Sequence, residues 1–299
     1  MKRAILASAL LLAPWAFAQQ EVVPGVRLIR GTFTPGSQPD GNSVVIDAPS
    51  GLVVVDSGRH ASHTQKILDL AKSSGRPIVA VVNTHWHLDH IGGNAAIRAA
   101  YPDVRVYASN ALDDALTGFL ATYRKQLAEQ PPSAAYEAEM KLIDSGKALA
   151  PDVVITKSAS QSLGGKTFRV GLERSVTQGD IWLFDEASGV LIAGDLVTLP
   201  APFLDTACPA QWSATLDKLA ALDFDVLIPG HGAPLTKRQF AVYRNAFNAL
   251  LHCDAKEACI SAWTKSVAPL TNDDAKFTAG LMGYYVDLLR SDRLAANCH

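Results

Sequence analysis

Apolar residues along the chain form short β-branched runs and longer helical patterns, separated by turns rich in glycine and proline. Short β-branched runs between turn residues predict strands, here at 26–30, 43–47, 52–56, 78–83, 153–156, 167–172, 181–184, 190–193 and 225–228. Apolar residues spaced three and four apart predict helices, here at 64–72, 110–146 with a break at Pro131 and Pro132, 209–222, and 235 to about 290. Two sheets with helices packed outside them would satisfy this order, which makes the expected fold class α+β.

The N-terminus has the pattern of a secretory signal. Lys2 and Arg3 precede an apolar stretch at 4–13, and Ala-Phe-Ala follows at 16–18. A positive start, a short apolar run and small residues before the cleavage point are typical of a signal peptide. A membrane anchor is disfavoured because the run is too short to span a bilayer. We expect residues 1–18 to be removed after Ala18, leaving a periplasmic or secreted protein without a stable membrane anchor.

Composition narrows the classes of protein further. Of the 299 residues, 48% are hydrophobic, which supports a substantial core and argues against a disordered chain. The formal net charge is −2, and no run of basic residues stands out. The chain therefore lacks the clustered cations of a nucleic-acid-binding protein. We expect a small-molecule partner instead, and the sequence leaves the oligomeric state open.

Four cysteines agree with export, at positions 208, 253, 259 and 298. In an oxidising compartment, four cysteines indicate two disulfides, for which three connectivities exist. Cys253 and Cys259 are separated by a short segment with the character of a turn between helices. Sequence proximity therefore favours a bridge between them, leaving Cys208 to pair with Cys298.

The highest density of candidate metal-binding residues follows the apolar run at 78–82. His85, His87, Asp89 and His90 fall within six residues. Imidazole and carboxylate groups gathered at the end of a strand are typical ligands of Zn²⁺. The alternative is a polar loop with satisfied histidines, but three of the eight histidines of the chain fall within these six residues, a density that chance rarely gives. We expect this loop to bind metal.

Two later strands also end in candidate ligands. The apolar run at 190–193 leads to Gly194 and Asp195, and the run at 226–228 leads to His231 between Gly230 and Gly232. Either motif alone is common in turns. Together with the histidine motif, they predict one constellation assembled at strand ends.

With these motifs, the sequence over roughly 22–250 resembles the metallo-β-lactamase superfamily. The resemblance implies a four-layer αββα sandwich at 19–234, followed by a helical, cysteine-containing extension at 235–299. It also implies one or two metal ions, usually zinc, and a supporting role near the metal for Asp56. The implied ligands are His85 and His87 for a first metal, Asp89, His90 and His231 for a second, and Asp195 as a bridge.

The sequence departs from the family pattern at one ligand. The family has a third histidine for the first metal where this chain has Val176, and valine cannot ligate a metal. The first site is therefore one ligand short. Four interpretations remain open: the site binds its metal weakly with water in the gap, it is empty, it uses a substitute ligand, or the protein has lost its activity. The substitutes to examine are Glu173, His60 and His63.

A metal site of this kind implies hydrolysis by an activated water, with Asp89 or Asp195 as the group that receives the proton. Asp195 stands where the β-lactamases of the superfamily usually carry Cys or Ser. The chain therefore looks more like the glyoxalase II and lactonase branches, with a weaker resemblance to the SoxH-like hydrolases of quinoprotein systems. We expect a hydrolase of an ester, thioester or lactone. The alternatives are a β-lactam hydrolase and a non-catalytic metal-binding protein, the latter because of Val176.

Overall fold

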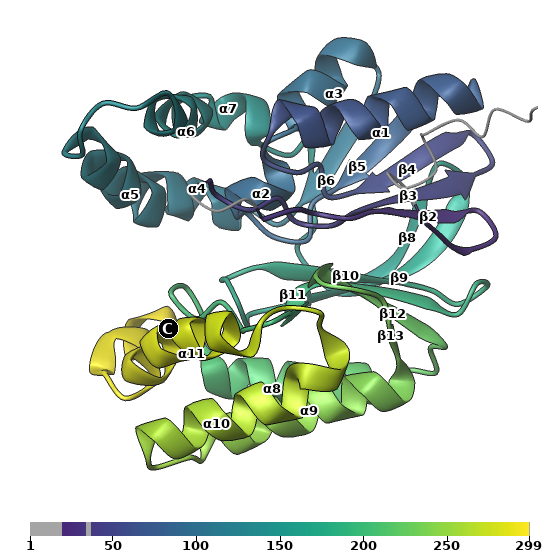
Figure 1. Ribbon diagram of the computed structural model, residues 1–299. Helices are drawn as coiled ribbons and strands as arrows, with labels where there is room; N and C mark the ends of the chain where they lie inside the picture. The colour runs from purple at the N-terminus through teal and green to yellow at the C-terminus, as the bar shows by residue number, and fades with distance from the viewer. Residues whose placement is uncertain (1–19, 34–36, 299) are drawn as a thin grey trace, which may run out of the picture.

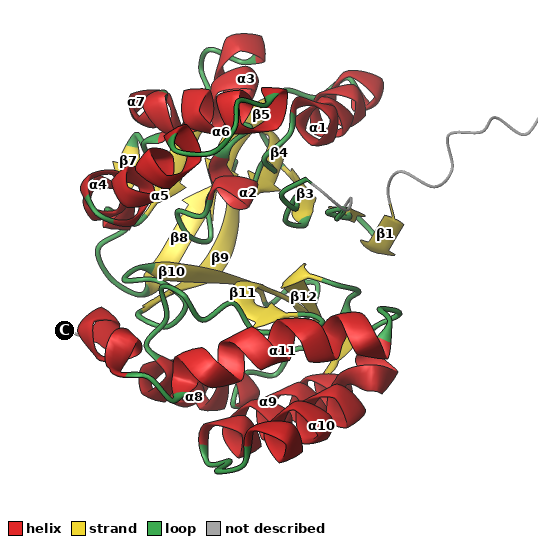
Figure 2. Cartoon of the chain, turned by 60° about the vertical axis from the view of Figure 1, so that its left-hand side comes forward, coloured by secondary structure: helices red, strands yellow, loops and turns green. Residues whose placement is uncertain are grey.

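The computed structural model describes residues 20–33 and 37–298, and the expected signal peptide lies outside them. Two β-sheets pack face to face, with helices on both outer sides (Figure 1), so that the fold is a four-layer αββα sandwich with a helical extension. The view in Figure 2, from another side, shows the same layers. No helix in the described part of the chain is long and apolar enough to cross a membrane.

The first sheet follows the order of the chain. Its strands are β1 (Gln20–Val23), β2 (Val26–Ile29), β3 (Ser43–Ala48), β4 (Gly51–Val55), β5 (Ile78–Val82), β6 (Arg105–Ala108) and β7 (Val153–Val154). The pairs from β1 to β4 are antiparallel, and those from β4 to β7 are parallel. The carboxyl ends of β4 and β5 therefore lie side by side at one edge.

The second sheet is antiparallel except for one pair. Its order is β13 (Leu235–Thr236), β12 (Val226–His231), β11 (Val190–Thr198), β10 (Asp180–Asp185), β9 (Lys166–Glu173) and β8 (Ala159–Leu163). Strands β11 and β12 are parallel, which brings their carboxyl ends together as well.

Helices cover the outer faces and one end of the sandwich. They are α1 (Ala61–Ser74), α2 (Leu88–Ile91), α3 (Asn94–Ala100), α4 (Ala111–Thr117), α5 (Phe119–Ala128), α6 (Ala134–Asp144), α7 (Gly146–Leu149), α8 (Pro209–Ala220), α9 (Lys237–Leu251), α10 (Lys256–Val267) and α11 (Ala275–Leu289), with 3₁₀ helices η1 (Ala268–Leu270) and η2 (Asp292–Cys298). Helices α1 and α3 pack on the first sheet, and α8 to α11 on the second.

Successive side chains of the central strands contribute to two different core layers, one between the sheets and one beneath the outer helices. In β4, Leu52 and Val54 pack towards α1 and α3, whereas Val53 and Val55 pack between the sheets. Successive side chains of a strand point to opposite faces, so a strand covered on both sides must be apolar throughout. This explains why the sequences of the central strands are continuous hydrophobic runs.

Most predicted elements are present, with differences where the apolar signal is weak. Strand β8 was not expected, because Ala-Ser-Gln-Ser-Leu carries few apolar residues for an outer strand paired only to β9. The expected helix from 235 begins later, at Lys237, since Leu235 and Thr236 pair with β12. Thr236 then starts α9 through a capping box with Gln239, which satisfies free backbone N–H groups of the first turn.

Both disulfides have the predicted connectivity. Cys253 is joined to Cys259 between α9 and α10. Cys208, at the start of α8, is joined to Cys298 at the end of η2, across a sequence separation of 90 residues. This second bridge fastens the C-terminal tail to the loop that precedes α8.

Candidate functional site

The candidate site lies between the sheets, where residues in or just after four strands meet. Asp56 follows β4, the histidine motif follows β5, Asp195 lies within β11, and His231 ends β12. The close approach of β11 and β12 requires Gly230, because a Cβ there would lie 1.9 Å from Oδ1 of Asp195. The tertiary fold thus joins segments that are more than 100 residues apart.

Hydrogen bonds around Asp56 fix the orientation of two histidines. Thr84 donates to Asp56 from its backbone N–H and from Oγ1, both at 2.7 Å, and His90 Nδ1 lies 2.7 Å from the same carboxylate. Because the Thr84 hydroxyl proton goes to Asp56, Oγ1 must accept from His85 Nδ1, at 3.0 Å. Each imidazole thus bonds through Nδ1 and directs Nε2 towards the centre of the site, as metal-ligating histidines do.

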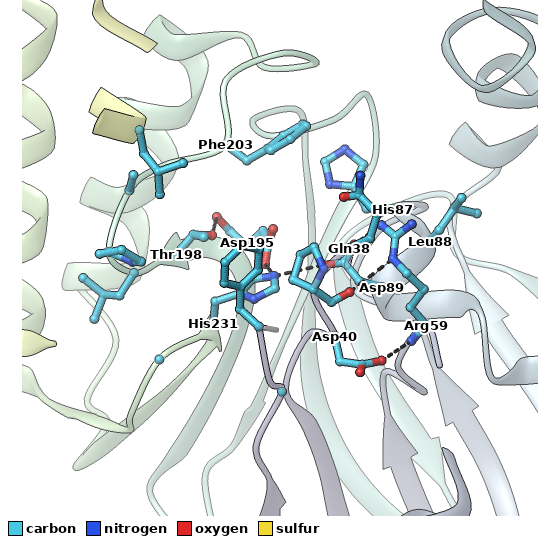
Figure 3. A pocket seen from close by; sticks show the side chains of 18 of the residues that line it. Gln38, Asp40, Arg59, His87, Leu88, Asp89, Asp195, Thr198, Phe203 and His231 are labelled. Atoms are coloured by element: carbon cyan, nitrogen blue, oxygen red, sulfur yellow. Dashed lines mark hydrogen bonds and ion pairs between the residues drawn. The ribbon is translucent and has the colours of Figure 1, made fainter. Parts of the chain in front are cut away.

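The candidate ligand atoms converge on one small space. His90 Nε2 lies 3.2 Å from Asp195 Oδ1 and 3.6 Å from Asp89 Oδ2, while His231 Nε2 lies 3.0 Å from Asp89 Oδ2. The second oxygen of Asp195 lies 3.7 Å from His85 Nε2. Among the described residues, two groups could hold a metal ion: Asp89 with His90 and His231, and His85 with His90 and Asp195. Figure 3 shows Asp89, Asp195 and His231 directed towards one another.

Unpartnered buried atoms show that this donor set fits a metal ion. Nε2 of His85, Nε2 of His90 and Oδ1 of Asp195 are all buried without a hydrogen-bond partner. A buried polar atom without a partner is costly, and a cation would satisfy all three at once. Two imidazole nitrogens and carboxylate oxygens are donors that suit Zn²⁺.

The electrostatics of the cluster favour a positive charge at the same place. Burial disfavours protonated His90, but the carboxylates of Asp195, Asp56 and Asp89 outweigh it and raise the pKa of His90 well above its usual range. Burial likewise opposes ionised Asp195, yet His90 and His231 lower its pKa to about 2. Asp89 and Asp195, whose pKa values both lie below their usual range, are therefore anionic at neutral pH, and a proton or a metal ion must compensate for them.

His87 is held differently from the other candidates. Its Nε2 lies 3.0 Å from Thr206 Oγ1, whose hydroxyl donates to the carbonyl of Val176 at 2.7 Å. Thr206 therefore accepts from His87 Nε2–H, which leaves Nδ1 with the free lone pair. Burial lowers the pKa of His87 to about 3, so the ring is neutral. His87 belongs to neither of the two groups that could hold a metal.

None of the three substitute ligands considered for the first site, Glu173, His60 and His63, lies in a group that could hold a metal. Val176 is fully buried in the core beneath the second sheet. Glu173 bonds to Lys218 at 2.6 Å, His60 to Asp40 at 2.9 Å, and His63 to Ser43 at 2.9 Å. Each of these side chains has its own partner outside the metal groups.

Arg59 lies in the site although no sequence pattern indicated it. Its guanidinium is largely buried, pairs with Glu139, and lies 3.5 Å from Asp89 Oδ1. The oxygen of Asp89 that faces away from His231 is thus held by a cation. Gly41 is a second missed position, since a Cβ there would lie 2.5 Å from the His90 ring.

A cavity of about 570 Å³ opens over the cluster and is lined by Asp89, Asp195, His231 and His87 (Figure 3). Its volume lies within the usual range for small-molecule sites. Trp86, Leu199, Pro200, Ala201 and Phe203 form part of its wall. Tyr285 of α11 also lines it.

Comparison with known proteins gives one family. The model of the metallo-beta-lactamase superfamily matches residues 37–231, which contain every candidate ligand. Among solved structures, a beta-lactamase domain protein from Burkholderia ambifaria is similar, with a TM-score of 0.61, 21% identity, and 91% of this chain and 87% of that chain covered. A metallo-beta-lactamase from Pontibacter korlensis has a TM-score of 0.58 and 20% identity, covering 77% of this chain and 98% of that one.

Two curated relatives are hydrolases. A linear primary-alkylsulfatase from Pseudomonas sp. (strain ATCC 19151) is 30% identical over 224 residues, covering 65% of this chain and 42% of its own length. A hydroxyacylglutathione hydrolase from Synechococcus sp. (strain JA-3-3Ab) is 34% identical over 159 residues, covering 53% of this chain and 50% of its own length. The chain thus spans half or less of the length of these relatives.

Proposed function

The chain belongs to the metallo-β-lactamase superfamily, and from this premise we propose that it is an exported, zinc-dependent hydrolase of an ester, thioester or lactone. One observation carries the proposal. The ligand atoms of Asp89, His90, Asp195 and His231 converge beside a cavity of small-molecule size, and the buried atoms Nε2 of His90 and Oδ1 of Asp195 have no hydrogen-bond partner there. A sulfate ester is a second candidate substrate, favoured by the 30% identity to an alkylsulfatase.

The proposed ligands of a tightly bound ion are Asp89, His90, Asp195 and His231. A divalent metal held there would supply Lewis-acid polarisation of the scissile group and a water of lowered pKa. Asp89 and Asp195 are the proposed proton acceptors. Arg59 positions Asp89 through Oδ1, and Asp56 orients His90 through Nδ1.

A substrate panel tests the proposed function. Purified protein loaded with Zn²⁺ is assayed on p-nitrophenyl esters, a thioester, a lactone, an n-alkyl sulfate and a β-lactam, with and without EDTA. We expect turnover of at least one of the first four classes, loss of that turnover with EDTA, and recovery with Zn²⁺. Turnover of the β-lactam alone would favour a β-lactamase. Bound metal without any turnover would favour a non-catalytic binding protein.

Export is supported by the two disulfides, because such bridges persist in oxidising compartments. The proposal is that residues 1–18 direct the chain to the periplasm or the medium. N-terminal sequencing of the exported protein should then begin at Gln19. An uncleaved N-terminus would contradict it.

The gap at Val176 predicts the metal stoichiometry. We expect about one tightly bound zinc per chain, because His87 belongs to neither group that could hold a metal and Val176 stands where the family has the third ligand. A Val176→His variant should raise the content to about two, as measured by inductively coupled plasma mass spectrometry. A larger side chain in a packed core typically costs about 1–3 kcal/mol, so Val176→Leu is the matched control for size. An unchanged metal content in Val176→His would show that the missing histidine is not what limits the first site.

A further inference from the structure

The cavity beside the metal ligands has a wall of aromatic rings that the metal chemistry does not require. Phe203 lies 4.8 Å from the His87 ring and 6.2 Å from Tyr285, measured between ring centroids. On the other side of His87, the Trp86 ring lies 4.6 Å from the His87 ring and 5.6 Å from the Phe119 ring, also measured between centroids. The rings form a continuous surface from α5, past the site, to α11.

The mouth of the cavity is apolar as well. Phe33, before β3, and Phe277, near the start of α11, lie 5.5 Å apart between ring centroids. Phe33, Phe119 and Phe277 all line the cavity, yet 54%, 40% and 37% of each side chain is exposed. Exposed apolar residues that gather around one opening mark a binding site rather than ordinary surface.

Charge on the lining disfavours a polyanionic substrate. The only arginines or lysines on the described lining are Arg30 and Arg59, and Arg59 is already paired with Glu139 and Asp89. Three carboxylates besides those of the metal groups also face the space, from Asp40, Asp205 and Asp273. An extended anionic group would meet more negative than positive charge there.

Helix α11 belongs to the C-terminal extension, beyond the residues 37–231 that match the family. It contributes Phe277, Leu281 and Tyr285 to the lining. Figure 1 shows α11 below and α5 above the same end of the two sheets. The apolar part of the cavity is therefore completed by a segment outside the residues that match the family model.

We propose that the substrate carries a large apolar group, of the size of a medium-length alkyl chain, which lies between α5 and α11 while the scissile bond lies at the metal ligands. Phe277 and Leu281 then determine specificity for chain length. This inference rests on the proposed hydrolase function for the scissile bond, but the apolar subsite binds its ligand whether or not hydrolysis occurs.

The first test compares ligands that differ only in chain length. The metal-loaded protein is titrated calorimetrically with butanoate, hexanoate and octanoate, and hydrolysis of p-nitrophenyl acetate, butanoate and octanoate is followed in parallel. Each methylene that enters an apolar site should tighten binding up to about 4-fold. We expect the Kd for octanoate to be at least ~10-fold lower than for butanoate, with kcat/KM for the esters rising in the same order.

The second test uses variants on α11. Phe277→Ala should weaken octanoate binding about 5-fold or more and leave butanoate binding unchanged. Alanine is a good helix former, and the backbone N–H of Phe277 still bonds to Asp274, so the helix should persist. Val242→Ala on α9 is the matched control, because Val242 is a similarly exposed apolar residue outside the cavity lining.

The outcomes separate the two proposals. Chain-length-dependent binding without hydrolysis of any substrate would refute the proposed function and support the apolar subsite. Hydrolysis with no dependence on chain length in either measurement would overturn the subsite. Equal loss of butanoate and octanoate binding in Phe277→Ala would also overturn it.

Discussion

Replacing His231 by alanine should lower zinc affinity and hydrolytic rate by about 100-fold or more. His231 Nε2 lies 3.0 Å from Asp89 Oδ2 and 3.6 Å from Asp195 Oδ1, so it is central to the proposed tight site. Removing even the hydrogen-bond partners of metal ligands typically costs about 10–100-fold, and loss of a ligand should cost at least as much. Zinc titration against a competing chelator and kcat/KM on the best substrate measure the two effects.

The fold should survive this substitution. The His231 side chain is partly exposed to the cavity, and its backbone carbonyl still accepts from Leu199 N. His252→Ala is the matched control, because His252 is exposed and lies outside the metal groups. Wild-type zinc affinity and rate in His231→Ala would remove His231 from the ligand set.

Removing the bridge between Cys208 and Cys298, by serine at both positions, should lower the free energy of unfolding by roughly 4 to 5 kcal/mol. The bridge closes a long segment, with a sequence separation of 90 residues, and therefore restricts the unfolded chain strongly. It also holds the tail at the cavity wall, where Asn297 donates to the carbonyls of Asp205 and Ala207. Urea unfolding followed by circular dichroism measures the change.

The other bridge provides the comparison within the same chain. Cys253 and Cys259 are separated by only 6 residues, so replacing both by serine should cost roughly 2 kcal/mol in the chain-entropy model. Both bridges include one buried cysteine, Cys208 or Cys259, which makes the substitutions comparable. Equal losses from the two double variants would contradict loop length as the cause.

Local patterns in the sequence were sufficient for most of the fold. Continuous apolar runs predicted β4, β5, β11 and β12 because these strands are covered on both faces, and the fold class followed from their order among the helices. Strand β8 was missed since its alternation is mostly polar. The start of α9 was misplaced because pairing of Leu235 and Thr236 with β12 is a long-range contact.

The sequence by itself determined which candidate metal ligands the chain carries and which strands contain or precede them, because residue type and strand pattern are local properties. It also identified Val176 as the position where the family resemblance implies a third histidine. Only the tertiary structure decided that Asp89, His90, Asp195 and His231 converge while His87 bonds to Thr206. Arg59 and α11 likewise entered the site only through packing. Contacts between distant segments depend on how the layers stack, and no periodicity within a single segment encodes that.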